Sequence, residues 1–294
     1  MALPTFDYVK AASLDEASEL QKKAGNTAMI MAGGTDIIPL LRDRKRTELK
    51  TIIDIKGIPG LDGLTYEEGK GLKIGGLTKL YTIQNDPVVN EKNKAVADAA
   101  HYVASAQIRR KGTMAGNICN ASPSADTAPI LIAMDASVKI YNKETGERTV
   151  PMDDFFTGFK KTAVVPENGD ILTEIDIPDL GPGEGSAYLD HSVRKAMDLA
   201  IVGVAAWLKM DGRKVEDVRL ALGGVAITPI RAPKAEAFLK GKELTDDVLE
   251  QAGEIASGEC SPIDDVRASA EYRTDMIRVY TKRAVKKAAD SIKA

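Results

Sequence analysis

Two short stretches of small residues have the composition needed to bind an anionic group. The first is Ala32-Gly33-Gly34-Thr35-Asp36, directly after a short apolar run. Adjacent glycines can adopt positive φ and turn successive backbone N–H groups toward one anion. A helix that begins directly afterwards adds the positive end of its dipole, so diphosphate is the natural ligand. An ordinary tight strand-to-helix turn has the same composition, and this loop alone does not decide between the two.

The second stretch is Gly112-Thr113-Met114-Ala115-Gly116-Asn117, in which a hydroxyl and an amide can hydrogen-bond phosphate or sugar oxygens. The polar turn Ala121-Ser122-Pro123-Ser124-Ala125-Asp126 follows shortly after. The carboxylate of Asp126 could accept hydrogen bonds from sugar hydroxyls, or it could cap a helix that begins near Thr127. A dinucleotide with two phosphates explains both loops together better than two unrelated turns.

Other sites of chemistry are not supported. The sequence contains neither GxGxxG after a strand nor GxxxxGK[ST]. His101 and His191 have no nucleophile motif nearby, so we expect structural roles and predict no catalytic residue. Two separated cysteines and no CxxC or HExxH make a zinc site or a complete iron–sulfur cluster improbable, and we predict no metal. Any redox role must therefore come from an organic cofactor. Cys119 could lie near such a cofactor, but we expect a small buried apolar side chain; Cys260 lies far along the chain.

The composition narrows the class of protein. Of the 294 residues 44% are apolar, enough for a sizeable core, and the net charge of -3 offers no electrostatic footprint for nucleic acid. No apolar stretch approaches the roughly 18 to 20 residues that cross a bilayer, so no membrane span is expected. The N-terminal sequence lacks a signal-peptide pattern, and the few cysteines fit a reducing cytoplasm.

The elements that position the two loops alternate between β-rich and helical runs. We predict a helix over 14–23 capped by Ser13, a strand over 28–32, and a second helix through Leu41 capped by Thr35 or Asp36. Further expected elements are strands at 51–55 and 72–75, a helix over 95–106, and a hairpin of strands 137–141 and 147–150.

Residues 178–185 contain two prolines and three glycines, and we place a domain boundary there. Beyond it we predict strands at 199–210 and 215–222 around an Asp211-Gly212 turn, then helices at 232–239, 246–256 and 270–289. The chain is therefore predicted to be α+β, with domains at 1–178 and 186–294.

The ordered set Ala32–Asp36, Gln107–Asn117 and Ser122–Asp126 resembles the FAD-binding (medium) subunits of the xanthine dehydrogenase and carbon monoxide dehydrogenase family of molybdenum hydroxylases. The segment Tyr188–Ile201, with Arg194, Asp198 and Ala200, is similar to the opening of that family's C-terminal domain. The resemblance covers nearly the whole chain, in the right order.

This resemblance implies a vanillyl-alcohol-oxidase-type (PCMH-type) FAD-binding domain followed by a smaller α+β C-terminal domain. It implies that both loops hold the FAD pyrophosphate, that Asp126 holds hydroxyls of the FAD chain, and that Ala104 and Ile171 or Leu172 pack beside the cofactor. No histidine lies in either loop, so we predict non-covalent FAD. The implied cofactor-binding residues are Ile30, Met31, Ala32, Gly33, Gly34, Thr35, Asp36, Ile37, Ala104, Thr113, Met114, Ala115, Gly116, Asn117, Asp126, Ile171 and Leu172.

The sequence departs from the family pattern at three points. Relatives usually have glycine where this chain has Ala115, which has less freedom of φ. Many relatives place a lysine at the position of Asp190, and a carboxylate cannot replace that donor, so Asp190 is left out of the site. Some relatives insert a cysteine-rich cluster loop, which two cysteines cannot supply.

The resemblance further implies a redox subunit without substrate chemistry of its own. Substrate would be oxidised in a molybdopterin-binding large subunit, and electrons would pass through a [2Fe-2S] small subunit to FAD and on to NAD or another acceptor, in a heterotrimer. Two alternatives remain open at this point: a stand-alone flavin oxidoreductase of the same fold, and a phosphoanion-binding scaffold without redox activity.

Overall fold

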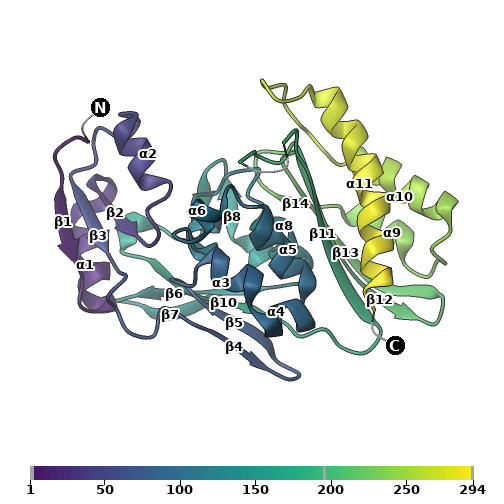
Figure 1. Cartoon of the computed structure of the whole chain (residues 1–294), viewed down its shortest axis with the longest axis horizontal. Coiled ribbons are helices and arrows are strands. Elements are labelled where there is room, and N and C mark those ends of the chain that lie inside the picture. The colour runs from purple at the N-terminus through teal and green to yellow at the C-terminus, as the bar shows by residue number, and fades with distance from the viewer. Residues whose placement is uncertain (1–2, 195–196, 293–294) are drawn as a thin grey trace.

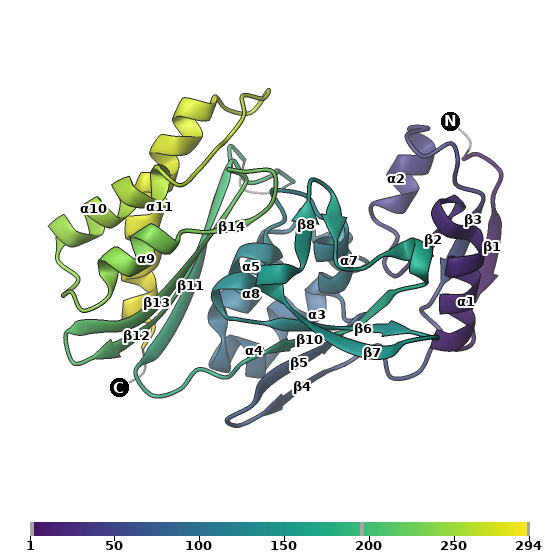
Figure 2. The same ribbon diagram turned by 180° about the vertical axis from the view of Figure 1, so that it is seen from behind.

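The computed structural model describes residues 3–194 and 197–292, and its elements form three units that follow one another along the chain (Figures 1 and 2). A small N-terminal unit lies at one end, a five-stranded sheet with helices lies in the middle, and a four-stranded sheet with three helices lies at the other end. The mixture of helix and sheet confirms the predicted α+β class. Among the described residues, no helix has the length and apolar composition to span a membrane.

The N-terminal unit is a three-stranded parallel sheet with a helix on each face. The strands, in sheet order, are β1 (Asp7–Lys10), β3 (Thr51–Asp54) and β2 (Ala28–Met31). The helices are α1 (Leu14–Ala24) and α2 (Ile37–Arg42), and a 3-10 turn spans Gly25–Thr27. Neighbouring residues of β3 point to opposite faces: Ile52 packs in the cluster with Leu41 of α2, and Ile53 in the cluster with Ala17 of α1. Burial on both faces explains why β2 and the centre of β3 are apolar, whereas the edge strand β1 is mostly exposed.

The two helix starts in this unit differ from each other. Ser13 caps α1 as predicted, because its Oγ accepts a hydrogen bond from the N–H of Glu16 at 3.2 Å. The prediction that Thr35 or Asp36 caps the second helix is wrong. Asp36 occupies the N-cap position of α2, but its side chain makes no capping bond and accepts from Asn120 Nδ2 at 3.1 Å.

The middle unit is a five-stranded antiparallel sheet in the order β4-β5-β10-β6-β7. Its strands are β4 (Leu64–Glu67), β5 (Gly71–Gly75), β10 (Ile171–Ile177), β6 (Ser137–Asn142) and β7 (Gly146–Pro151), so the predicted hairpin is confirmed. The helices are α3 (Leu80–Asn85), α4 (Pro87–Lys92), α5 (Lys94–Tyr102), α6 (Ala106–Arg109), α7 (Met114–Cys119) and α8 (Thr127–Ala133). A two-stranded hairpin, β8 (Phe156–Gly158) and β9 (Lys161–Thr162), and 3-10 turns at Met152–Asp154 and Pro166–Asn168 complete the unit.

The helix predicted over 95–106 is interrupted. α5 ends at Tyr102, and Ala104 adopts a left-handed conformation with φ of 48°. The buried guanidinium of Arg109 replaces the missing helical bonds by donating from one terminal nitrogen to the carbonyl of Val103 at 3.0 Å and to that of Ala104 at 3.4 Å. A buried cation thus stabilises a bend that helix propensity alone does not reveal.

The C-terminal unit is a four-stranded antiparallel sheet in the order β11-β12-β13-β14. Its elements are β11 (Glu184–His191), β12 (Val202–Asp211), β13 (Lys214–Gly223), β14 (Ile230–Arg231), α9 (Pro233–Leu239), α10 (Asp246–Ser257) and α11 (Ala270–Asp290). The predicted hairpin turn at Asp211-Gly212 and all three predicted helices are confirmed within one or two residues at their ends.

Both faces of β12 are buried, and they face different units. Val202, Val204, Ala206 and Leu208 belong to the apolar cluster formed with α9, α10 and α11. Ala205 and Trp207, between them in sequence, belong to the core of the middle unit, where α5 and α8 contact the sheet. Because successive strand residues alternate between faces, the long apolar run of β12 is the signature of a sheet covered on both sides.

The segment between Ile177 and Glu184 connects the middle and C-terminal sheets. The domain limits 1–178 and 186–294 stay a prediction, and the chain ends and residues 195–196, within the segment Tyr188–Ile201, lie outside the described residues.

Candidate cofactor-binding site

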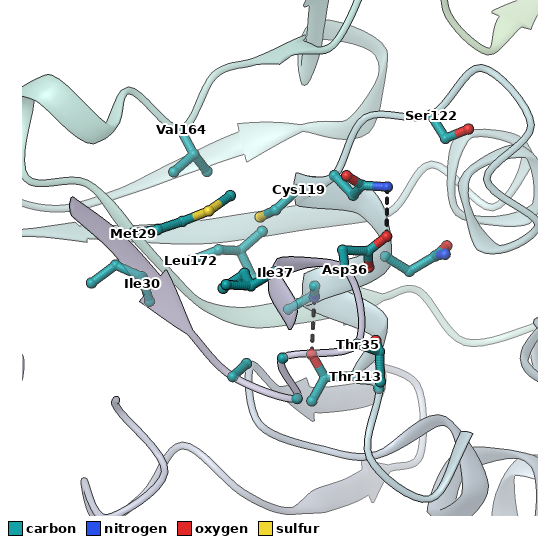
Figure 3. A pocket seen from close by; sticks show the side chains of 18 of the residues that line it. Met29, Ile30, Thr35, Asp36, Ile37, Thr113, Cys119, Ser122, Val164 and Leu172 are labelled. Carbon is teal, nitrogen blue, oxygen red and sulfur yellow. Dashed lines mark hydrogen bonds between the residues drawn. The ribbon is translucent and has the colours of Figure 1, made fainter. Parts of the chain in front are cut away.

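A cavity of about 650 Å³ lies where the three units meet, and both small-residue loops line it (Figure 3). Its walls include Gly33 from the N-terminal unit, Thr113 and Leu172 from the middle unit, and Leu199 from the start of the C-terminal unit. The volume is in the range of small-molecule and cofactor sites, which commonly lie between domains.

The two loops are in direct contact. A Cβ on Gly33 would lie 2.2 Å from the carbonyl oxygen of Lys111 and 2.9 Å from Cα of Gly112. Only a residue without a side chain allows this approach, since the contacted atoms are backbone and cannot rotate away. Leu80 N–H donates to the carbonyl of Gly112 at 3.0 Å and fixes the second loop from its other side. The sequence-based expectation that the two bends converge agrees with this geometry.

The first loop leaves consecutive backbone donors free. Within the described residues, no protein acceptor is hydrogen-bonded to the N–H groups of Gly33, Gly34, Thr35 or Asp36. Gly34 adopts φ of 74°, the left-handed conformation that turns successive N–H groups to one side. Four adjacent unpaired donors at a cavity wall are an anion-binding arrangement, and an anion there would satisfy them.

The second loop is the first turn of α7. Thr113 is its N-cap, and the Thr113 Oγ1 accepts from the N–H of Gly116 at 2.9 Å, which leaves the hydroxyl proton available to a ligand. The Oδ1 of Asn117 accepts from the hydroxyl of Thr127 at 2.6 Å. Ala115 is helical and has no positive φ, so alanine in place of the family's glycine costs no conformational strain here.

Apolar side chains line another part of the cavity. Met29, Ile30, Val164 and Leu172 lie together there, as Figure 3 shows. Ile171 and Leu172 are the first residues of β10, and both are buried. Such walls suit the flat faces of an aromatic ring system.

Most of the predicted site residues line this one cavity. They are Ile30, Ala32, Gly33, Gly34, Thr35, Asp36, Ile37, Ala104, Thr113, Ala115, Gly116, Asn117, Ile171 and Leu172. Met31, Met114 and Asp126 are not among its lining residues. The side chain of Met31 packs with Ile37 and Leu41, and that of Met114 is fully buried in the core of the middle unit.

Asp126 faces the interior instead of the cavity. Only 5% of it is exposed, and its Oδ1 accepts from the hydroxyl of Tyr188 on β11 at 3.1 Å. Its side chain does not cap α8 either, although it occupies the N-cap position. Burial, together with the nearby charge of Asp190, raises the pKa of Asp126 to about 7. The residue therefore joins the middle unit to the C-terminal sheet.

The expected burial of Cys119 is wrong. The sequence suggested a small buried side chain, but Cys119 is solvent-exposed and lines the cavity, as Figure 3 shows. Burial raises the pKa of the thiol to about 12, so the protonated thiol predominates at neutral pH.

Sequence reasoning missed several residues of the cavity. Arg46, Asn120 and Lys160 all line it but belong to no motif with a phosphate-binding signature. Only the topology brings them together. The two histidines lie elsewhere, and the ring of His191 lies between the hydroxyls of Tyr272 and Tyr280 at 2.9 and 3.1 Å, which fits a structural role. The described residues contain no cluster of three metal-ligating side chains.

The sequence matches two known families in succession. Residues 4–180 match the family described as the FAD binding domain in molybdopterin dehydrogenase, and residues 187–288 match the CO dehydrogenase flavoprotein C-terminal domain. The chain belongs to the FAD-binding subunits of the molybdenum hydroxylase family.

Individual members of this family are similar along their whole length. The carbon monoxide dehydrogenase medium chain of Hydrogenophaga pseudoflava is 33% identical over 97% of each chain. The putative xanthine dehydrogenase FAD-binding subunit of Escherichia coli is 34% identical over 96% of this chain and 95% of the relative. A solved carbon monoxide dehydrogenase structure from H. pseudoflava superposes with a TM-score of 0.92 at 34% identity, over 98% of each chain.

This molybdenum hydroxylase subunit is therefore an FAD-dependent oxidoreductase subunit with the predicted FAD-binding and C-terminal domains. The residues in the cavity fit FAD, because unpaired backbone donors suit its diphosphate and the apolar wall suits a ring.

Proposed function

We propose that this subunit transfers electrons from the iron–sulfur clusters of a [2Fe-2S] small subunit through FAD to NAD or another acceptor. Substrate is oxidised in a separate molybdopterin-binding large subunit. The multi-subunit character of the relatives, several of which are named as medium chains or subunits, supports this proposal. FAD, when bound, supplies the ability to exchange electrons one or two at a time. The protein contributes binding, orientation and exclusion of water.

In this proposal each part of the cavity holds a different part of FAD. The N–H groups of the first loop, with the hydroxyl of Thr113 and the amide of Asn117, hold the pyrophosphate. Ala104, Ile171 and Leu172 pack against the rings. This assignment follows the family resemblance except at Asp126. We assign Asp126 to the junction between the middle and C-terminal units instead of to the cofactor, because it does not line the cavity and accepts a hydrogen bond from Tyr188.

The observation that carries the proposal is the run of four unpaired N–H groups beside the second loop, in a chain of this family. Chemistry on a substrate would need a general base, a nucleophile or a metal in the same cavity. Among the described lining residues, Cys119 has a thiol with a raised pKa, and Asp170 is held by Arg148 with an N···O distance of 2.6 Å. Neither is poised for proton transfer to a substrate, and the two other lining carboxylates are engaged as well: Asp198 is paired with Arg194, and Asp36 accepts a hydrogen bond from Asn120 beside the unpaired N–H groups.

The function can be tested by comparing the chain alone with the chain co-expressed with its neighbouring genes. Alone, the yellow protein should pass electrons from an added reductant to artificial acceptors and oxidise no small substrate. With large and small subunits present, substrate oxidation should reduce its flavin. Turnover of a small substrate by the isolated chain would favour a stand-alone oxidoreductase, and a colourless chain that takes up no FAD would indicate a scaffold.

The FAD is expected to be non-covalent. Cys119, the cysteine that follows the second loop, has a thiol with a pKa of about 12, so almost no thiolate is present to attack a flavin at neutral pH. Acid denaturation followed by ultrafiltration should therefore release all the flavin into the filtrate. Absorbance near the flavin band retained on the precipitated protein would contradict this prediction.

A further inference from the structure

We propose that Lys160 supplies the positive charge that holds the cofactor diphosphate, and that the β8–β9 hairpin carries it as a clamp over the first loop. This inference rests on the proposed function of the cavity as the FAD site. No phosphate-binding motif contains Lys160, which lies more than 40 residues beyond the second loop.

Lys160 is the unpaired cation of the cavity. Of the described lining residues only Arg46 and Lys160 carry a positive charge. Arg46 is already engaged, since its guanidinium is ion-paired with Glu48. Lys160 makes no ion pair within residues 3–194 and 197–292, although its side chain borders the cavity.

The charge of Lys160 acts on the anion-binding loop. Burial raises the pKa of Asp36, and the nearby Lys160 ammonium partly offsets that rise. Asp36 is the last of the four residues with unpaired N–H groups. Lys160 and the residues with free donors also line the same cavity, so an anion bound by those donors would share the cavity with this ammonium.

The other acidic groups of the cavity have cations of their own. Asp170 is paired with Arg148, and Asp198 with Arg194. Asp36 has only the neutral amide of Asn120 as a hydrogen-bond partner. Of the three carboxylates among the described lining residues, Asp36 alone has no ion-pair partner, and Lys160 offsets its charge without forming an ion pair with it. The ammonium therefore remains available to a ligand.

A diphosphate needs such a charge. Backbone N–H groups contribute dipoles but no net charge, so two phosphate charges placed beside Asp36 would be left largely uncompensated. A lysine is a mobile point charge that commonly serves phosphate groups.

The backbone conformation indicates that Lys160 is held in position at a cost. Its φ of 52° lies in the left-handed region, which disfavours residues other than glycine, asparagine and aspartate. The neighbouring Lys161, in β9, is equally exposed but does not line the cavity. It therefore provides a matched control of the same charge on the same hairpin.

The experiment measures binding of FAD and of riboflavin to flavin-free full-length protein by flavin fluorescence. We expect Lys160→Gln to weaken FAD binding about tenfold or more and Lys161→Gln to change it little. Lys160→Arg should largely restore binding. Riboflavin, which has no phosphate, should bind Lys160→Gln and wild type equally. The FAD affinity of wild type should also fall more steeply with added salt than that of Lys160→Gln.

A fourth variant separates charge from backbone strain. Lys160→Gly should melt at the same or a higher temperature than wild type, because glycine accepts the positive φ, and it should still bind FAD as weakly as Lys160→Gln. The inference alone would be overturned if Lys160→Gln bound FAD as tightly as wild type. It would also be overturned if Lys160→Gln lost riboflavin affinity as much as FAD affinity, or if Lys161→Gln lost as much FAD affinity as Lys160→Gln. Wild type that binds no FAD would overturn the proposed function, and the inference with it.

Discussion

Replacing Gly33 with alanine is expected to lower FAD affinity by about 100-fold or more and to destabilise the fold by about 1–3 kcal/mol. The new Cβ would lie 2.2 Å from the carbonyl oxygen of Lys111, and 2.8 Å from its carbon. Both atoms are backbone, so the clash can be relieved only by moving the two loops apart. That movement would separate the unpaired N–H groups of the first loop from the donors of the second.

The matched control is Gly57→Ala. Gly57 has ordinary φ, and an added Cβ meets no atom within 4 Å, so its affinity and melting temperature should match those of wild type. If Gly33→Ala does not fold, Gly34→Ala offers a milder change, because only its φ of 74° and a flexible Met31 side chain oppose the methyl group. Tight FAD binding by a folded Gly33→Ala variant would show that contact between the loops is not needed.

The second large effect concerns pH and the buried Asp126. Its folded pKa of about 7 lies above the unfolded value, so between these two pH values the folded protein binds a proton that the unfolded chain releases. The contribution of Asp126 to stability must then fall as pH rises from about 4 to about 7, by up to about 4 kcal/mol. Asp126→Asn removes the ionisable group and keeps an acceptor for the hydroxyl of Tyr188.

We therefore expect Asp126→Asn to unfold at higher denaturant concentration than wild type at pH 8 and at nearly the same concentration at pH 4.5. The groups around Asp126 are Tyr188 and Asp190 of β11 and Tyr102 of α5, none of them cationic. Asp62→Asn, which changes an exposed carboxylate, is the control and should leave the pH profile unaltered. Equal stability of wild type and Asp126→Asn at both pH values would contradict the assignment.

The local parts of this site were predictable from sequence because they are contiguous. Gly33-Gly34 between an apolar run and a helical run requires a tight bend, and the hairpin at Asp211-Gly212 follows from turn chemistry alone. Ser13 caps α1 for the same reason, since the donor and the acceptor are three residues apart.

The parts that sequence reasoning missed depend on burial and on tertiary contacts. The bend at Ala104 is stabilised by Arg109, which is near in sequence but is buried by the fold, and Asp126 accepts a hydrogen bond from Tyr188, more than 60 residues away. Lys160, which lies between β8 and β9, lines the cavity although it is far from both small-residue loops in sequence. No local propensity or spacing encodes these positions, so only the tertiary structure reveals them.

The shared strand β12 has a consequence for how such subunits can diversify. Ala205 and Trp207 belong to one core while Val204 and Ala206 belong to the other, so neither half of the chain can be exchanged for that of a relative as an independent cassette. A chimera would pack the C-terminal sheet of one protein, including the indole ring of Trp207, against the middle unit of another, and the two surfaces would not be complementary. Substitutions on this strand are therefore constrained jointly by both halves.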